Sequence, residues 1–350
     1  SLYGNWVLGV LPPASVGGWC SINPTQSLVD AFFMEDGTEP ILGYNADGSP
    51  KINPNAPLYS EKGFSTKPEY RATDYYLMDG YNDSNYPDVT PERDGKRLIV
   101  QPNTFNMYCH REPRFYLTVV WNGQWFKWEN RNTNFLYGQP DGGPTHDAPQ
   151  NGYLNRSRVS LDYIPRDNNH PYRPAIIFRM AEAYLSYAEA LNESSERMSH
   201  KQEILDNLNK IRHRAGIAEY GTGTDENGFT RIKINFSDQK EVRRLIHKER
   251  RVEFVGEGVR YHDLRRWKTA HYGIGNLNEQ GENPDWGVNG PDYGMNYYGT
   301  EYTDQGDNAF FKRTKYMDRV YPRKFYWYPI HQSEIDKDPT LVQGPFWLGE

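Results

Sequence analysis

The sequence predicts a mainly α fold, in which helix pairs combine with long irregular loop-rich regions and a few short β-hairpins. Two observations lead to this prediction. Residues 172–192, 202–214 and 237–270 repeat apolar side chains with the 3.6-residue period of an amphipathic helix. The remaining stretches lack a sustained period and gather most of the 31 glycines and 24 prolines.

Composition indicates an ordered protein rather than a disordered one. The 350 residues suffice for one large domain or two ordinary ones. Only 37% of the residues are hydrophobic and the mean hydropathy is −0.88, yet 15% are aromatic. Disordered chains are poor in aromatic residues, so we expect long but ordered loops. The formal net charge of −6 argues against a nucleic-acid partner.

The two cysteines, Cys20 and Cys109, are too few for a disulfide scaffold. They form either one bridge or two buried thiols. No apolar run approaches the roughly 18 residues of a membrane span. Ser1 begins without the pattern of a signal peptide, as expected of a processed or excerpted chain.

The longest helical pattern runs from Ser237 to Ala270 and predicts a helix, a tight turn and a second helix. Asp238 and Glu241 have the spacing of a capping box, with Ser237 as a rival cap. Gly256 and Gly258 interrupt the pattern. The predicted apolar stripe consists of Val242, Leu245, Ile246, Val252 and Val255, with Glu249 in one turn of it.

This stretch is also dense in charges of both signs, and two interpretations remain open. One is a solvated helix face with ion pairs three or four residues apart. The other is that Glu249 or Glu253 pairs with an arginine where helices meet, partly buried. Arginine suits such a position because its planar guanidinium can hold a carboxylate with two hydrogen bonds.

Two further helices are predicted upstream. In residues 172–192, Pro174 suits the first turn. The inward stripe there is Ile177, Met180, Tyr184, Tyr187, Ala188 and Leu191. Residues 202–214 form the next helix, and Gly216 ends it. Short connections between successive helices favour antiparallel pairs, stacked in the manner of tetratricopeptide repeats.

The N-terminal half is less regular. Residues 23–41 predict a short helix capped by Thr25. Residues 43–97 show no regular period and contain many turn signals and tyrosines. The density of tyrosine favours a functional loop. Residues 115–128 predict a hairpin with its turn at Asn122-Gly123. Within it Trp121, Trp125 and Trp128 alternate, and we expect at least one in the core.

Several segments, in this order, resemble the SusD/RagB family of outer-membrane lipoproteins. They are NPTQSLVDAFFMEDG, REPRFYLTVVWNG, RPAIIFRMAEAYLSYAEALNE, LNKIRHRAGI, IHKERRVEFVGEGVRYHDLRRW, YPIHQSEIDKDP and QGPFW. Family members carry a further N-terminal portion with the lipid-bearing cysteine. The resemblance therefore implies that this chain is the C-terminal two-thirds of such a protein.

The resemblance implies three regions: a loop-rich ligand-binding region in 1–170, tetratricopeptide-like helical pairs in 171–270, and an irregular C-terminal region in 271–350. It implies a protein held at the outer membrane, on the cell surface, by a lipid anchor that is not in this chain. It also implies delivery of an oligosaccharide to a SusC-like TonB-dependent transporter.

No motif for catalysis or for a cofactor is present, and we expect no enzyme activity, no cofactor and no metal. His247 and His262 fit structural roles. Asp79, Asp83 and Asp88 have a spacing that fits no known calcium loop. A glycoside hydrolase remains a competing hypothesis, because the separation of two carboxylates is not visible in sequence.

A sugar site needs aromatic faces for pyranose rings and polar groups for hydroxyls. Loops 43–97 and 271–307 have that composition. The location of family sites favours Tyr75, Tyr76 and Tyr81, with Trp286 from the second loop. The structural interpretation is that each ring only packs within its own loop. The predicted function is glycan capture without bond cleavage. A peptide-binding member of the family and a structural helical-repeat adaptor are two further hypotheses.

Overall fold

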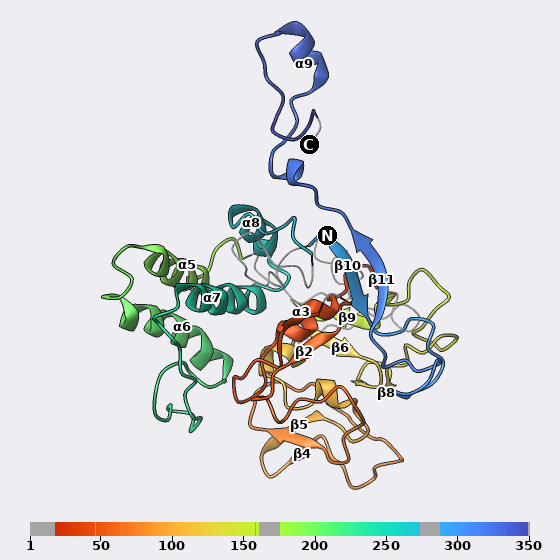
Figure 1. Ribbon diagram of the computed structural model, residues 1–350. Coiled ribbons are helices and arrows are strands. Elements are labelled where there is room, and N and C mark those ends of the chain that lie inside the picture. Colours follow the sequence, from red (N-terminus) through yellow and green to blue (C-terminus); the bar gives the residue numbers. More distant parts are fainter. Residues whose placement is uncertain (1–17, 46, 158, 161–175, 274–287, 349–350) are drawn as a thin grey trace.

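The computed structural model describes residues 18–45, 47–157, 159–160, 176–273 and 288–348, and Figure 1 shows its arrangement. A helical part lies beside a loop-rich body that contains small sheets, and a C-terminal segment extends away from both (Figure 1). The α-helices of the described residues are α3 (Gln26–Ala31), α4 (Pro113–Tyr116), α5 (Met180–Glu193), α6 (Lys201–Ala215), α7 (Gln239–Glu253), α8 (Val259–Arg266) and α9 (Gln332–Lys337).

The α7–α8 hairpin confirms the strongest sequence prediction. The Asp238 side chain accepts hydrogen bonds from the backbone N–H groups of Lys240 and Glu241, which makes it the N-cap of α7. Gly256 and Gly258 have φ angles of 76° and 79°, in the left-handed region that glycine adopts at little cost. The chain can therefore reverse between α7 and α8 within a few residues.

Helices α5, α6 and α7 bury one shared apolar core. The first half of the stripe predicted for α7 lies in it, and Val242 and Ile246 are fully buried. Val252 and Val255, from the second half of the stripe, pack instead against the core of the loop-rich body. Other members of this core are Ala181, Leu185, Ala188, Leu191, Ile204, Leu208, Ile211, Leu245 and Phe254.

The prediction for residues 172–192 is wrong in two respects. Helix α5 begins only at Met180, and residues 172–175 lie outside the described residues. The predicted stripe also contains side chains that face solvent: Ile177 is 97% exposed and Tyr187 is 48% exposed. The face that packs on α6 and α7 carries the predicted Ala188 and Leu191 together with Ala181 and Leu185, which the prediction did not include.

The acidic side chains of α7 are buried in ion pairs, so the interpretation as a purely solvated face is wrong. Glu249 contacts Arg114 at 2.7 Å and Arg212 at 3.2 Å, and its side chain is fully buried. Glu253 contacts Arg114 at 3.0 Å. Because Arg114 belongs to α4, these pairs join the helical part to the loop-rich body. Arg250 and Asp263 make a further buried pair at 2.9 Å.

The loop-rich body contains short antiparallel strands, most of them where the sequence suggested irregular structure. They pair as β1 with β2, β3–β5–β4, β6 with β9, β7 with β8, and β10 with β11. Their bounds are β1 Ile41–Tyr44, β2 Pro50–Ile52, β3 Glu69–Arg71, β4 Glu92–Arg93, β5 Lys96–Val100, β6 Val119–Trp121, β7 Trp125–Phe126, β8 Arg131–Asn132, β9 Tyr153–Asn155, β10 Gly290–Gly294 and β11 Thr314–Arg319.

The hairpin prediction for residues 115–128 needs correction, whereas one of the turn signals in residues 43–97 does join a hairpin. The strands that flank Asn122-Gly123 do not pair with each other: β6 pairs with β9 and β7 pairs with β8. The Phe135 N–H donates to Asn122 Oδ1 at 2.7 Å, so a third segment holds this turn and its strands diverge. Conversely, Asp94-Gly95 joins β4 to β5, with positive φ at both residues as a type I′ turn requires.

The core of the loop-rich body is largely aromatic. Trp121 is fully buried, Trp125 is 3% exposed, and Trp128 lies at intermediate depth. Other aromatic side chains that are almost fully buried include Phe32, Phe33, Phe105, Tyr108, Phe115, Tyr116, Phe126, Phe135, Tyr153 and Phe310. Cys20 and Cys109 are both buried and no disulfide joins them, which decides between the two predicted states.

Candidate functional site

The structure separates the tyrosines predicted for the site. Tyr81 is only 4% exposed and packs edge-to-face on Trp125 with ring centroids 5.3 Å apart. This burial raises the pKa of Tyr81 and leaves its ring no face for a ligand. Tyr75 is half-buried against the same core. Trp286 lies outside the described residues.

Tyr76 is the exposed member of the predicted set, at 44%. The guanidinium of Arg97 lies 3.8 Å above its ring centroid, and Arg93 lies 5.1 Å above Tyr70 on the same small sheet. Such contacts are cation–π interactions. One face of each ring is therefore occupied by a cation, which limits how a sugar can stack on it.

A pocket of about 340 Å³ lies elsewhere on the loop-rich body, and its composition matches what a sugar requires. Trp19 is 47% exposed and forms part of its lining. The carbonyl oxygen of the Asn23 side chain is buried and has no hydrogen-bond partner in the described part of the chain. Further lining residues are His146, Asp147, Gln150, Asn151 and Tyr316.

The hydroxyl of Tyr316 lies 3.4 Å from a carboxylate oxygen of Asp292. Burial, followed by the charge of Asp292, raises the pKa of Tyr316 to about 12. The hydroxyl therefore remains protonated at neutral pH. The pocket thus combines an indole ring, amide groups and a hydroxyl, all suited to hydrogen bonding with neutral sugar hydroxyls.

Three tyrosines near this pocket form an aromatic cluster in which Tyr298 is exposed and Tyr137 and Tyr297 are half-buried. Tyr298 is 71% exposed, and its ring lies 5.7 Å from that of Tyr137 and 5.1 Å from that of Tyr297. The Tyr297 hydroxyl donates to the carbonyl of Thr145 at 3.3 Å, beside the pocket residue His146. We call Tyr137, Tyr297 and Tyr298 the tyrosine cluster. Its rings meet at angles of 42° to 83°, and the exposed ring of Tyr298 offers a face on which a sugar can stack.

Tyr297 and Tyr298 lie in loop 271–307, whose composition suits a sugar site, but composition does not distinguish them from the other tyrosines of that loop. The glycines close to them in the sequence are a signal that could single them out. A Cβ at Gly143 would clash with the Tyr297 hydroxyl, so this glycine permits the close approach of the two loops. The partner loop is distant in sequence, and no local pattern reveals it.

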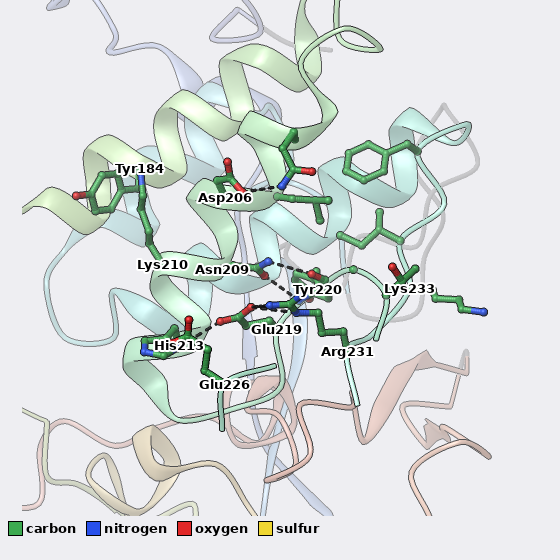
Figure 2. Close-up of a pocket in the computed structure, with 16 residues that line it drawn as sticks. Tyr184, Asp206, Asn209, Lys210, His213, Glu219, Tyr220, Glu226, Arg231 and Lys233 are labelled. Atoms are coloured by element: carbon green, nitrogen blue, oxygen red, sulfur yellow. Dashed lines mark hydrogen bonds and ion pairs between the residues drawn. The ribbon is translucent and has the colours of Figure 1, made fainter. Parts of the chain in front are cut away.

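A larger groove of about 850 Å³ lies on α6 and the segment that follows it, and Figure 2 shows its charged lining. Glu219 lies between Arg231, at 2.8 Å, and His213, at 3.3 Å (Figure 2). Lys210 lies 4.5 Å from the ring centroid of Tyr184. This groove is therefore more charged than the pocket near Trp19, and it offers less open aromatic surface.

The pocket near Trp19 does not resemble a hydrolase centre. Among its lining residues in the described chain, Asp147 is the only carboxylate. Most glycosidases need two carboxylates that flank the scissile bond. The arrangement is better suited to holding a sugar than to cleaving one.

SusD-like proteins have this architecture: a scaffold of packed helices beside a loop-rich body with exposed aromatic rings. The profile of the SusD family matches residues 3–347, so the chain belongs to this family. Proteins of this family are in general outer-membrane-associated lipoproteins that bind glycans for a SusC partner, without catalysis. In the described part of the chain, no helix is both long and apolar enough to cross a membrane.

Individual relatives agree with this assignment. SusD-like proteins P25 and P38 of Formosa agariphila are each 32% identical, over 109 and 103 residues. These matches cover 31% and 29% of this chain, and 18% and 19% of the relatives. A crystal structure of a SusD-like protein from Bacteroides fragilis matches 99% of this chain and 52% of its own, with a TM-score of 0.55 at 24% identity. That likeness shows the fold, and the chain spans about half the length of that structure.

Proposed function

We propose that the protein captures a glycan at the cell surface and delivers it to a SusC-like TonB-dependent transporter. The observation that supports this proposal is the tyrosine cluster, with Tyr298 71% exposed, beside a pocket that combines Trp19 with amide side chains. Aromatic faces bind the apolar sides of pyranose rings, while amides and hydroxyls bind their hydroxyl groups. The tetratricopeptide-like pairing of α5 to α8 belongs to this proposal as the scaffold that meets the transporter.

Calorimetric titration with a panel of soluble polysaccharides tests the proposal. We expect saturable binding that Trp19→Ala and Tyr298→Ala each weaken at least tenfold. Tyr76→Ala, run in parallel, tests the site predicted from the sequence. Tyr328→Ala is the matched control, because Tyr328 is 79% exposed but lies on the C-terminal segment.

The outcomes separate the competing functions. Binding that Tyr328→Ala abolishes and Tyr298→Ala leaves unchanged would place the site elsewhere. New reducing ends in the titrated sample would identify a glycosidase. Absence of binding to every glycan would count against glycan capture.

A peptide is the second candidate ligand, because the groove on α6 is charged. Lys210, Lys233 and Glu226 line it, which suits charged side chains better than neutral sugars (Figure 2). Titration with a mixed peptide digest, compared between the wild type and Lys210→Ala, tests this candidate. Peptide binding that Lys210→Ala weakens would support it.

A further inference from the structure

Three side chains in the loop-rich body bring metal-binding atoms together, away from the pocket near Trp19. The His110 Nδ1 atom lies 3.2 Å from Glu35 Oε1 and 3.6 Å from Glu69 Oε1. One ligand atom from each residue lies within 4.8 Å of the others. In a tetrahedral zinc site, bonds of about 2.0–2.1 Å place neighbouring ligand atoms roughly 3.3 Å apart. We propose that Glu35, Glu69 and His110 bind a divalent transition metal ion, Zn²⁺ in the first place.

Arg71 contacts one oxygen of each carboxylate, the one farther from the Nδ1 atom of His110. Arg71 Nη2 lies 2.6 Å from Glu35 Oε2 and 3.5 Å from Glu69 Oε2. The guanidinium thus contacts the outer oxygen of each carboxylate, and both Oε1 atoms face His110, whose backbone N–H also donates to Glu69 Oε1 at 3.1 Å. Contacts of this kind orient the ligands of metal sites and strengthen metal binding.

The backbone also holds the three residues in place. The Glu35 N–H donates to the His110 carbonyl at 2.8 Å, beside an antiparallel bridge between Met34 and Arg111. The His110 N–H donates to the Glu69 carboxylate at 3.1 Å. His110 itself has φ of 54°, a left-handed conformation that is uncommon outside glycine. The imidazole is therefore placed by main-chain contacts on both sides.

The cluster is open enough for a metal ion and a water molecule to enter. The side chains of His110, Glu35 and Glu69 are 39%, 33% and 14% exposed. With three protein ligands, a tetrahedral ion would keep one position for water. The negative charges of the two carboxylates offset the repulsion between the ion and Arg71.

The chemical types of the three ligand atoms favour some metal ions over others. Calcium prefers six to eight oxygen ligands, and these residues offer an imidazole nitrogen in place of such a shell. One imidazole with two carboxylates suits Zn²⁺ and related transition metals. The competing arrangement is an ion-pair cluster, in which a proton on His110 bridges the two carboxylates. Metal titration distinguishes the two.

We would titrate metal-free protein with ZnCl₂ at pH 7.5 in a calorimeter. We expect one equivalent to bind, with affinity at least tenfold lower in Glu69→Gln and in His110→Asn. Asparagine is chosen because it tolerates positive φ. His213→Asn is the matched control, since its ring lies 3.3 Å from a single carboxylate, Glu219, and is 49% exposed. The control should leave zinc affinity unchanged.

Circular dichroism of each variant verifies that it is folded, and X-ray absorption of the zinc-loaded protein reads the ligands directly. A first shell of nitrogen or oxygen neighbours with the outer-shell scattering of one imidazole, lost in His110→Asn, supports the site. Absence of stoichiometric binding overturns the proposal. Equal zinc affinity in His110→Asn and wild type overturns it as well, because the ion would then be held elsewhere.

Discussion

Replacing Arg114 by methionine tests whether the ion pairs between α4 and α7 stabilise the joint between the two parts of the molecule. The Arg114 Nε atom donates to Glu112 at 2.6 Å, and Nη1 donates to Glu249 at 2.7 Å and to Glu253 at 3.0 Å. Methionine keeps the unbranched stem of the side chain but removes the guanidinium group and its charge. All three carboxylates lose a partner at once.

The three carboxylates differ in what remains. Glu249 keeps Arg212, and Glu253 keeps Arg179 and Arg214. Glu112 is fully buried and keeps only the Phe33 N–H among the partners found in the described chain. Burial already raises the pKa of Glu112 although Arg114 lies beside it. We therefore expect the free-energy cost to fall mainly on Glu112.

The loss of unfolding free energy in Arg114→Met is set by whichever state of Glu112 costs less, ionised without a partner or protonated. Leaving a buried charge without its partner costs about 3–5 kcal/mol. Protonating Glu112 instead, from an ordinary pKa of 4.5, costs about 1.4 kcal/mol per pH unit, or roughly 3.4 kcal/mol at pH 7. The expected loss of unfolding free energy is therefore about 3 kcal/mol at pH 7 and about 1.4 kcal/mol at pH 5.5.

The sign of the pH dependence follows from linkage. In Arg114→Met the pKa of Glu112 is higher in the folded than in the unfolded state, so folding takes up a proton between these two values. The variant therefore gains stability relative to wild type as pH falls from 7 toward 4.5. Urea unfolding followed by tryptophan fluorescence measures this, with a midpoint about 1 M lower at pH 7.

Glu112→Gln combined with Arg114→Met is the control variant, because it removes the carboxylate that Arg114 neutralises. It should recover part of the lost stability at pH 7 and show little pH dependence of the difference. A single variant within about 0.5 kcal/mol of wild type would refute the reasoning. So would a loss of stability that is the same at pH 5.5 as at pH 7.

Two further predictions concern other buried groups. Burial raises the pKa of Glu39, but Lys248 at 2.8 Å and Arg244 at 2.6 Å outweigh it and hold the pKa well below its usual value. The stability that ionised Glu39 contributes is thus present above about pH 4.5 and is lost as the pH falls further. In Glu39→Gln the urea midpoint should therefore change less between about pH 5 and pH 3 than it does in wild type. Burial also raises the pKa of the Cys20 and Cys109 thiols. Neither should react with a thiol reagent at pH 8 in native protein, and both should react in urea; fast native labelling would contradict this.

Local pattern predicted the elements whose determinants are close in sequence. Helix α7 was predicted with its cap because Asp238 and the apolar stripe that begins at Val242 lie within two turns. The pairing of β6 was missed because its partner, β9, follows about 30 residues later. The Asn122-Gly123 turn exists, but the hydrogen bond from Phe135 determines which way the chain leaves it.

The candidate site was harder to predict than the helices. Composition predicts the kind of residue, tyrosine in a loop, and this prediction stays open to the titration proposed above. Composition could not distinguish Tyr81, which packs on Trp125, from Tyr298, which faces solvent. That difference depends on which distant loop covers each ring. A single sequence does not specify such long-range packing.

Glu249 shows how much a single sequence can establish about a buried contact. Its position within an apolar stripe places its side chain toward the core, as the structure confirms. A carboxylate buried without a partner is too costly to be retained, so that position favours the second of the two interpretations, a cation where helices meet. The identity of the cation is not predictable in this way, because Arg114 lies 135 residues earlier. A charged residue within an apolar stripe therefore indicates that another element packs there, even when the residue that pairs with the charge is not known.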